Sequence, residues 1–480
     1  MNLFKNKIFI YIGSRYLTYA LQFVLSLLIA QRLGPFYMGV YGMINLILGY
    51  FGQTNFGIQH ALNVVLVHNK NDVEAGDRYT YNALMLYTYQ NILIVIGSVI
   101  VSVFHGDVWG DYDLTRYFPL IIITAVVIYY KFVLVTVLRV RNQINALSLT
   151  GTIPVLLDLV VVWFFEGEKL VLALTIVGLI GCLITMYVCV KKGVLPKKIS
   201  RGVSFQCQKT LMSKGLNLFL YNSCFYFIIM SIRSIVSSNF SVQEFGYFTF
   251  SFTLANAALM LLDSINAIIF PKTLDVLSVE SNEQKINVLE KMRVAYISTS
   301  HCMIYLAMLF FPLIVWAMPK YKEALPTMNM IAMAVLVNTN SYGFTSLLIA
   351  QNKEKISARI SLIALIINVA LGIVLVKVFN VDLSKTIIAT LISYLVFSFL
   401  AAYEGYKLLR GKGSLLFTLT HFFPYKMLIP YLVAFVIAFF NVEFLIFIPF
   451  VLYVILNYSD FAFLIKIAMK FIKEPNVIDI

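Results

Sequence analysis

Five ionisable side chains lie inside long apolar stretches of the sequence, where charge is costly. Three are cations, Arg15, Lys131 and Arg233, and two are acids, Asp158 and Asp263. Such residues nearly always face a protein interior or a wet cavity, because hydrocarbon does not solvate charge. Arginine grips phosphate through a planar fork, whereas lysine acts as a point charge. The three cations are therefore candidate ligands for one shared anion, and the two acids are candidates for coupling a proton or a sodium ion.

Each of these residues also has a plainer interpretation. Arg15, Lys131 and Arg233 all stand near a predicted membrane surface, so each side chain can snorkel to the interface instead of facing a cavity. Asp158 and Asp263 can be buried ion-pair partners of those cations. Aromatic rings suit sugar faces, but we expect interfacial aromatic belts to account for most of the tyrosines, including Tyr79, Tyr81, Tyr87, Tyr89, Tyr129 and Tyr130.

The segments that carry these residues are predicted membrane spans. Apolar residues make up 60% of the chain and charged residues only 12%, against about 25% charged in a globular protein. Apolar runs long enough to cross a hydrocarbon core of about 30 Å recur from end to end. In lipid these runs must be helical, because an open strand leaves its backbone unsatisfied. The fourteen predicted spans are 8–30, 37–59, 80–104, 117–138, 148–165, 170–190, 215–236, 246–270, 294–316, 325–350, 357–379, 384–404, 424–441 and 443–459.

The charge pattern predicts the orientation. The formal charge is +14, but basic residues in a membrane protein mostly fix topology and sit beside anionic lipid, so nucleic acid is not an expected partner. With the N-terminus inside, about 27 of the 37 basic residues fall on the inner side. Both termini are therefore expected in the cytoplasm. The inner set includes Arg139, Arg141, the basic residues of 191–214, Lys285, Lys291, Arg293, Lys353, Lys355, Arg359, Lys407, Arg410 and Lys412.

The chain also repeats itself. Residues 35–41 resemble 242–248, Phe118-Pro119 matches Leu325-Pro326, and 139–143 match 349–353, all at offsets of about 207 to 210 residues. Each repeat holds six spans, so both have the same orientation and a pseudo-two-fold axis along the membrane normal is expected. The predicted parts are a six-helix bundle at 1–190, a basic cytoplasmic linker at 191–214, a second bundle at 215–410, and spans 13 and 14 with an amphipathic cytoplasmic tail at 411–480.

Several motifs resemble one group of membrane proteins. Residues 30–42, which read AQRLGPFYMGVYG, resemble the segment that closes the first span and opens the second in polysaccharide-exporting flippases. Asn55-Phe56-Gly57 stands where that family usually has D-L-G. Arg233 precedes Gly246 by the family's spacing, with Ile232 in place of the usual acid. Over about residues 1–410 the chain is thus similar to Wzx-type O-antigen flippases of the multidrug/oligosaccharidyl-lipid/polysaccharide exporter superfamily, although two family carboxylates are missing.

The resemblance implies a V-shaped, alternating-access transporter in the bacterial inner membrane. Its expected substrate is undecaprenyl-diphosphate-linked oligosaccharide, moved to the periplasmic leaflet by membrane potential or by antiport of H+ or Na+. Membrane lipids, a glycan polymerase and a chain-length regulator are the expected partners. Two alternatives remain open: a multidrug exporter of the toxic-compound extrusion type, and a membrane-embedded glycan polymerase. No enzymatic motif, metal site or cofactor site is recognised; the five cysteines form no C-x-x-C pair.

Overall fold

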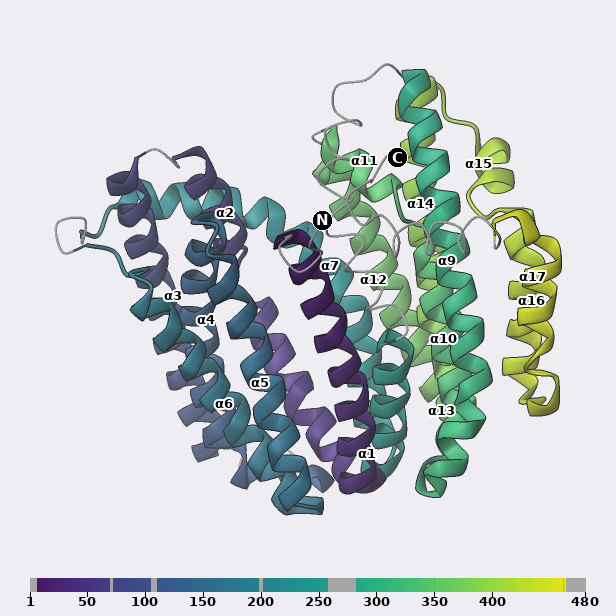
Figure 1. Ribbon diagram of the computed structural model, residues 1–480, viewed down its shortest axis with the longest axis horizontal. Coiled ribbons are helices and arrows are strands. Elements are labelled where there is room, and N and C mark those ends of the chain that lie inside the picture. Colours follow the sequence, from purple (N-terminus) through teal and green to yellow (C-terminus); the bar gives the residue numbers. More distant parts are fainter. Residues whose placement is uncertain are drawn as a thin grey trace. The chain divides into compact units, whose positions relative to one another are not determined.

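The computed structural model describes residues 7–69, 72–104, 110–197, 202–257, 282–351, 353–460 and 462. In this part of the chain the regular elements are all helices (Figure 1). Eight of the helices are long and apolar enough to cross a membrane, or nine if a bent pair near the C-terminus forms one span. The protein is therefore a multi-pass, all-α membrane protein. The total of fourteen spans stays a prediction.

Contacts divide the chain into two compact units. We call Val24–Tyr226 with Ser241–Gly246 the N-terminal unit, and Met1–Phe23, Phe227–Phe240 and Tyr247–Ile480 the C-terminal unit. The helices α1 (Lys7–Gln53) and α7 (Phe205–Asn239) each contribute to both units, which the linear boundaries predicted from the repeat do not describe. Those boundaries, at residues 190, 214 and 410, stay a prediction.

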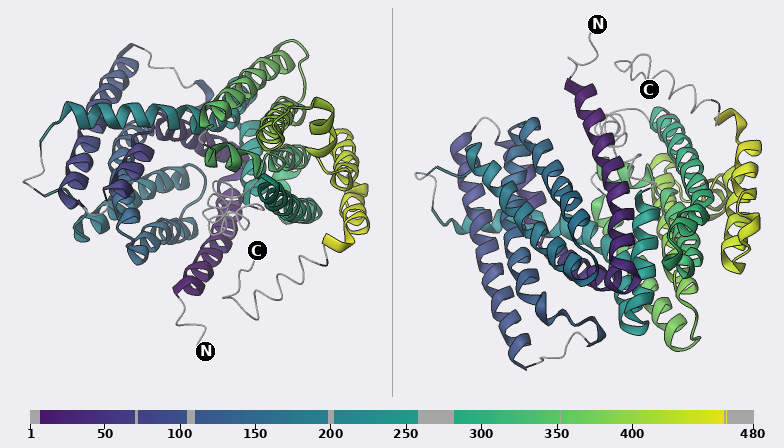
Figure 2. Two further views of the ribbon diagram at one scale, coloured as in Figure 1. Left: turned by 90° about the horizontal axis from the view of Figure 1, so that it is seen from above. Right: turned by 60° about the horizontal axis from the view of Figure 1, so that its bottom comes forward.

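Among the described residues before the linker there are six helices and two short 3₁₀ turns. Within the N-terminal unit, α4 packs against α2, α3 and α6, and α6 packs against α5 (Figure 2). The buried core between α2, α3 and α4 includes Tyr87 and Tyr129. The elements are α1 (Lys7–Gln53), α2 (Ile58–His68), α3 (Val73–Phe104), η2 (Gly110–Tyr112), η3 (Leu114–Arg116), α4 (Phe118–Val140), α5 (Ile144–Phe164), α6 (Gly167–Lys191) and α7 (Phe205–Asn239).

After α7, residues 242–257 are helical. In the C-terminal unit α14 packs against α12 and α10, and α16 packs against α17 and α10. The remaining elements are α9 (Asn282–Ala317), η5 (Pro319–Ala324), α10 (Leu325–Thr339), α11 (Phe344–Ala350), α12 (Glu354–Lys377), α13 (Leu383–Thr386), α14 (Ile388–Arg410), α15 (Leu415–His421), α16 (Tyr425–Phe440), η6 (Glu443–Leu445) and α17 (Ile448–Leu456).

Three predicted spans contain or meet breaks that periodicity does not reveal. Gly34, at φ 69° and ψ 169°, bends α1 where Pro35 follows it, so the first two predicted spans share one bent helix. A non-helical segment at 54–57 ends α1 before the predicted limit of 59. Residues 340–343 divide the predicted span 325–350 into α10 and α11. Glycine permits the positive φ at Gly34 because it has no Cβ.

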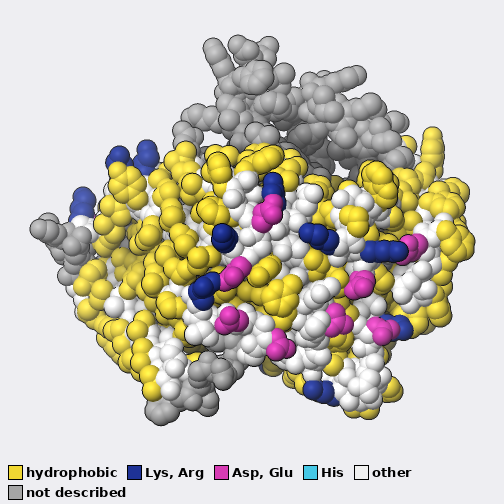
Figure 3. Space-filling model, turned by 90° about the horizontal axis from the view of Figure 1, so that it is seen from below, with side chains coloured by type: hydrophobic (Ala, Val, Ile, Leu, Met, Phe, Trp, Pro, Cys, Tyr) yellow, Lys and Arg dark blue, Asp and Glu magenta, His cyan; other side chains and the backbone are white. Residues whose placement is uncertain are grey.

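The surface fits the membrane assignment. Large apolar side chains are exposed along α3, where Leu93 and Val103 are each 70% exposed. Lipid tails satisfy such side chains as well as a protein core does. On the face seen from below, acidic and basic side chains are interspersed (Figure 3). Ion pairs from Arg32 to Glu166 and from Arg116 to Glu168 join α1, η3 and the start of α6 within the N-terminal unit.

Candidate functional site

Two of the five predicted site residues lie beyond what the structure describes. Asp263 falls in the gap between residues 257 and 282, and the side chain of Arg15 is not described although its backbone belongs to α1. The predicted amphipathic tail after residue 460 also lies almost wholly outside the described residues. The roles of these residues therefore stay predictions.

Lys131 and Asp158 both belong to the N-terminal unit. The Nζ atom of Lys131 on α4 donates to the Sγ atom of Cys182 on α6 at 3.4 Å. Asp158 on α5 is half-buried and interacts electrostatically with Tyr41 of α1. Among the described residues neither side chain forms an ion pair. The carboxylate of Asp158 is thus an intramembrane acid whose charge no described cation neutralises.

Arg233 lies in the part of α7 that belongs to the C-terminal unit. Its guanidinium lies 5.6 Å from the centre of the Phe252 ring, a cation–π contact within that unit. The side chain is half-buried. Because Lys131 belongs to the other unit, a single anion site that uses both cations stays a prediction.

A buried polar cluster surrounds the break between α1 and α2, which the sequence did not reveal. The hydroxyl of Tyr129 donates to the carbonyl of Phe51 at 2.5 Å and lies 2.9 Å from Thr54 Oγ1. Gln90 Nε2 donates to the carbonyl of Thr54 at 2.5 Å. These side chains satisfy the carbonyls that the end of α1 leaves without helical partners. The belt interpretation is therefore wrong for Tyr129, and also for Tyr87, which stacks on it at 5.2 Å with no exposed surface.

Asn55 holds this break through both polar atoms of its side-chain amide. Its Oδ1 accepts the N–H of Gly57 at 2.8 Å, and its Nδ2 donates to the carbonyl of Gly52 at 2.7 Å. A carboxylate could make only the first of these bonds, because it has no N–H to donate. Gly57, at φ 69°, packs its backbone against Gly215 of α7. Asn55 thus closes this turn with an uncharged side chain.

The two repeated motifs cross each other within the N-terminal unit. A Cβ atom at Gly39 would collide with the carbonyl of Val242, and one at Gly246 would collide with the carbonyl of Pro35. Pro35 corresponds to Val242 in the repeat, and Gly39 corresponds to Gly246. The contact is therefore reciprocal, as expected for two segments related by a two-fold axis. Only glycine lets the two backbones approach this closely.

The second of these segments is fixed at its start. Ser241 and Glu244 form a capping box: Ser241 N donates to Glu244 Oε2 at 2.9 Å, and Glu244 N donates to Ser241 Oγ at 3.2 Å. Phe245, fully buried, meets the ring of Tyr112 edge-on at 6.0 Å. Burial raises the pKa of the Tyr112 hydroxyl, and Asp111 adds to the effect. Residues 241–246 are thus anchored in the N-terminal unit, whereas the chain on both sides belongs to the other unit.

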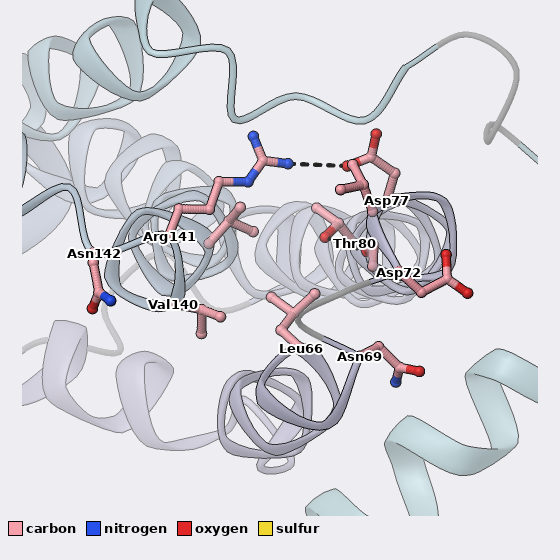
Figure 4. A pocket seen from close by; sticks show the side chains of 11 residues that line it. Leu66, Asn69, Asp72, Asp77, Thr80, Val140, Arg141 and Asn142 are labelled. Atoms are coloured by element: carbon pink, nitrogen blue, oxygen red, sulfur yellow. Dashed lines mark hydrogen bonds and ion pairs between the residues drawn. The ribbon is translucent and has the colours of Figure 1, made fainter.

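A cavity of about 430 Å³ lies between the ends of α2, α3 and α4 (Figure 4). The side chains of Arg141 and Asp77 point toward one another across it, with Arg141 Nη2 3.1 Å from Asp77 Oδ1. Asp77 is 3% exposed, and its Oδ2 accepts the backbone N–H of Lys197 at 3.1 Å. Arg141 Nη1 donates to the carbonyl of Gly193 at 2.8 Å. The pair therefore holds the linker that follows α6.

Asn82 continues this attachment along α3. Its Nδ2 donates to the carbonyl of Gly202 at 3.1 Å, and its Oδ1 accepts the N–H of Ser204 at 2.8 Å. Because α7 begins at Phe205, these bonds place the start of that helix. The predicted linker is thus, in its described part, docked on α3 through its backbone.

In the C-terminal unit, Arg293 likewise binds backbone groups of segments between helices. Its guanidinium donates to the carbonyls of Asn340 at 2.7 Å, Tyr342 at 3.0 Å and Phe422 at 2.8 Å, and it lies 3.8 Å from the Phe344 ring. Charge counting places Arg293 among inner-side basic residues, but it is only 4% exposed. The arginine joins the break between α10 and α11 to the bend between α15 and α16.

No protein-family model and no curated protein matches the chain, but solved structures share its fold. An inward-facing multidrug resistance MATE family transporter of the MOP superfamily aligns with a TM-score of 0.71 and 12% identity, over 85% of this chain and 99% of that one. An outward-facing structure of such a transporter gives 0.60 and 13%, over 84% and 95%. A MOP superfamily transporter from Pyrococcus furiosus, described as having a binding pocket of reverse polarity, gives 0.54 and 13%, over 84% and 94%. The fold of this chain is that of these transporters.

Proposed function

We propose that this protein is a membrane transporter that works by alternating access. The observation that carries the proposal is the fold, which aligns with almost the whole length of a MATE transporter. The reciprocal contact of Gly39 and Gly246 supports it, because it supplies a close, symmetric joint between the two repeats. The likeness is to transporters, so we do not propose a membrane-embedded polymerase.

For the substrate, the comparisons favour export of organic compounds of the multidrug type. Two of the solved structures are described as multidrug resistance transporters. The half-buried Asp158, without an ion pair among the described residues, supports this choice. An intramembrane carboxylate can bind a cationic compound or a proton in turn. The intramembrane cations with described side chains, Lys131 and Arg233, contact a thiol and an aromatic ring within their own units.

Lipid-linked oligosaccharide is the second candidate substrate. The motifs at 30–42 and around Arg233 support it, as does the excess of intramembrane cations, since a diphosphate headgroup needs positive partners to leave water. One MOP superfamily transporter of similar fold is described as having a binding pocket of reverse polarity, which suggests a different function for that protein. This supports a second class of substrate as a candidate here.

Reconstitution tests both candidates. Purified protein in proteoliposomes is assayed for efflux of ethidium, a lipophilic cation, and for flipping of fluorescent undecaprenyl-diphosphate-linked oligosaccharide. An interior-negative potential of about 100 mV favours outward movement of two negative charges by about 4–5 kcal/mol and opposes that of one positive charge by about 2.3 kcal/mol. The two activities should therefore respond to imposed potential with opposite signs. Absence of both activities in a folded preparation would contradict the transporter proposal.

Charge variants identify the residues involved. For drug export we expect Asp158→Asn to abolish ethidium efflux and Lys131→Ala to leave it unchanged. For the lipid substrate we expect Lys131→Ala and Arg233→Ala to lower flipping without loss of protein from the membrane. Lys191→Ala, which removes an exposed cation at the end of α6, is the matched control. Wild-type rates in every variant would show that these charges take no part in transport.

A further inference from the structure

The short helix α15, which connects α14 to α16, has no role in the proposed transport. Gly411, at φ 71°, ends α14, and Ser414 caps α15 by accepting the N–H of Phe417 at 3.2 Å. The short helix α15 is bent by 70° from α16. We take α16 as the membrane-crossing part of this pair, because the two helices together are apolar enough to cross a membrane, and the 70° bend then turns α15 toward the bilayer plane. On this assignment α15 is an interfacial helix.

The two faces of α15 differ in what they contact. Leu415, Leu416 and Leu419 are 64%, 74% and 60% exposed and share one face. On the other side, Phe417 packs against the buried cluster that includes Tyr406. Three exposed leucines on so short a helix need an apolar environment, which lipid acyl chains provide. The helix therefore rests on the protein by one face and offers the other to the membrane.

Two exposed cations, Arg410 and Lys412, precede α15 in the chain. The guanidinium of Arg410 lies 3.6 Å from the centre of the Phe417 ring and 6.0 Å from that of Tyr406. Stacking fixes the plane of the guanidinium but uses none of its N–H groups, so these can still donate hydrogen bonds. Lys412 is exposed and follows two residues later. Neither residue forms an ion pair with a described carboxylate, whereas their neighbour Lys407 is 3.7 Å from Glu404.

We propose that Arg410 and Lys412 bind the phosphate of an anionic lipid headgroup, with the leucines of α15 inserted among its acyl chains. Arginine recognises phosphate through paired N–H donors, and lysine adds charge. Positive-inside counting places both residues at the inner leaflet, which carries the anionic lipid. Free phosphate offers the same headgroup chemistry, but it has nothing to place against the exposed leucines. The site is separate from the intramembrane charges considered for transport.

Lipid selectivity measures the headgroup contact. The full-length protein is reconstituted in bilayers of equal phosphatidylglycerol and phosphatidylcholine, extracted mildly, and its retained lipids are quantified by mass spectrometry. We expect the wild type to retain more phosphatidylglycerol than phosphatidylcholine. This enrichment should fall about fivefold in Arg410→Gln and about fivefold again when Lys412→Gln is added. Arg410→Lys should lose part of the enrichment, because it keeps the charge but not the planar donors.

The control and a second measurement make the test decisive. Lys377→Gln removes an exposed cation at the far end of α12 and should leave the enrichment unchanged. A nitroxide at Leu416→Cys, in a background without the native cysteines, should be reached by oxygen from the acyl region more readily than by a water-soluble nickel complex. Three results would each overturn the proposal. The double variant could retain as much phosphatidylglycerol as the wild type, Lys377→Gln could lose as much as the double variant, or millimolar inorganic phosphate could displace the lipid.

Discussion

Gly39 lies with its Cα against the backbone carbonyl of Val242, at a distance that leaves no room for a Cβ atom. The equivalent contact joins Gly246 to Pro35. In each contact the glycine of one repeat meets the residue four positions before the glycine of the other repeat. Both contacts lie within the N-terminal unit, while the helix ahead of Ser241 and the helix beyond Gly246 continue into the C-terminal unit. This crossing is the point at which we expect the two halves of a transporter to stay together.

Alanine at either glycine should therefore impair the protein. Gly39→Ala and Gly246→Ala must push two backbones apart, and overpacking of this kind costs about 1–3 kcal/mol. We expect a lower thermal unfolding temperature and slower transport in both. Gly97→Ala is the control, since Gly97 is in α3 with open space around its Cα. Wild-type stability in the Gly39 and Gly246 variants would show that the close approach is not required.

The crossing should keep its geometry during transport. Phe36 and Gln243 are equivalent in the repeat, and both are exposed beside the contact. We expect spin labels at Phe36→Cys and Gln243→Cys, in a background without the native cysteines, to give the same distance with and without substrate. A label pair at Val203 and Lys412, one in each unit, should change its distance. If the first pair moves as much as the second, the crossing is not a pivot.

Loss of Arg293 should destabilise both the break between α10 and α11 and the bend between α15 and α16. Arg293→Gln removes a buried guanidinium that satisfies three carbonyls, and each buried polar group left unpaired costs about 1–3 kcal/mol. We expect a drop in the thermal unfolding temperature that is much larger than for Arg78→Gln. Arg78 is exposed, and among the described residues its side chain forms an ion pair with Glu74 alone, at 3.5 Å, which is worth about 0.3–0.5 kcal/mol. Similar shifts in the two variants would contradict the role given to Arg293.

Removal of the Asp77 carboxylate should release the linker. In Asp77→Ala the N–H of Lys197 loses its acceptor, and the guanidinium of Arg141 keeps the carbonyl of Gly193 but loses the carboxylate. We expect faster tryptic cleavage after Lys192 and Lys197, followed by mass spectrometry of the fragments. Asp72→Ala is the matched control, because Asp72 lines the same cavity but its carboxylate accepts only the nearby N–H of Ala75 among the described contacts. Cleavage that stays slow in Asp77→Ala would refute the docking role.

Much of the architecture is determined by the sequence alone. The long apolar runs predict helices, because only a helix satisfies its own backbone in lipid. Each predicted span with described residues is mainly helical in those residues, although the spans 37–59 and 325–350 contain breaks. The repeat offset of about 207 residues identifies the equivalence of Gly39 with Gly246 before any contact is known. The scarcity of intramembrane charge likewise selects Lys131, Asp158 and Arg233 as the residues to test.

The tertiary structure decided what those residues and their neighbours contact. Apolar periodicity cannot show the breaks at 54–57 and 340–343, because each is stabilised by distant side chains such as Tyr129 and Arg293. Charge counting assigns Arg293 to a side of the membrane but cannot show that it is buried, since burial depends on α10, α11 and the segment before α16. The crossing of Gly39 and Val242 is decided in the same way: a sequence gives the order of two glycines, and only folding brings their backbones into contact.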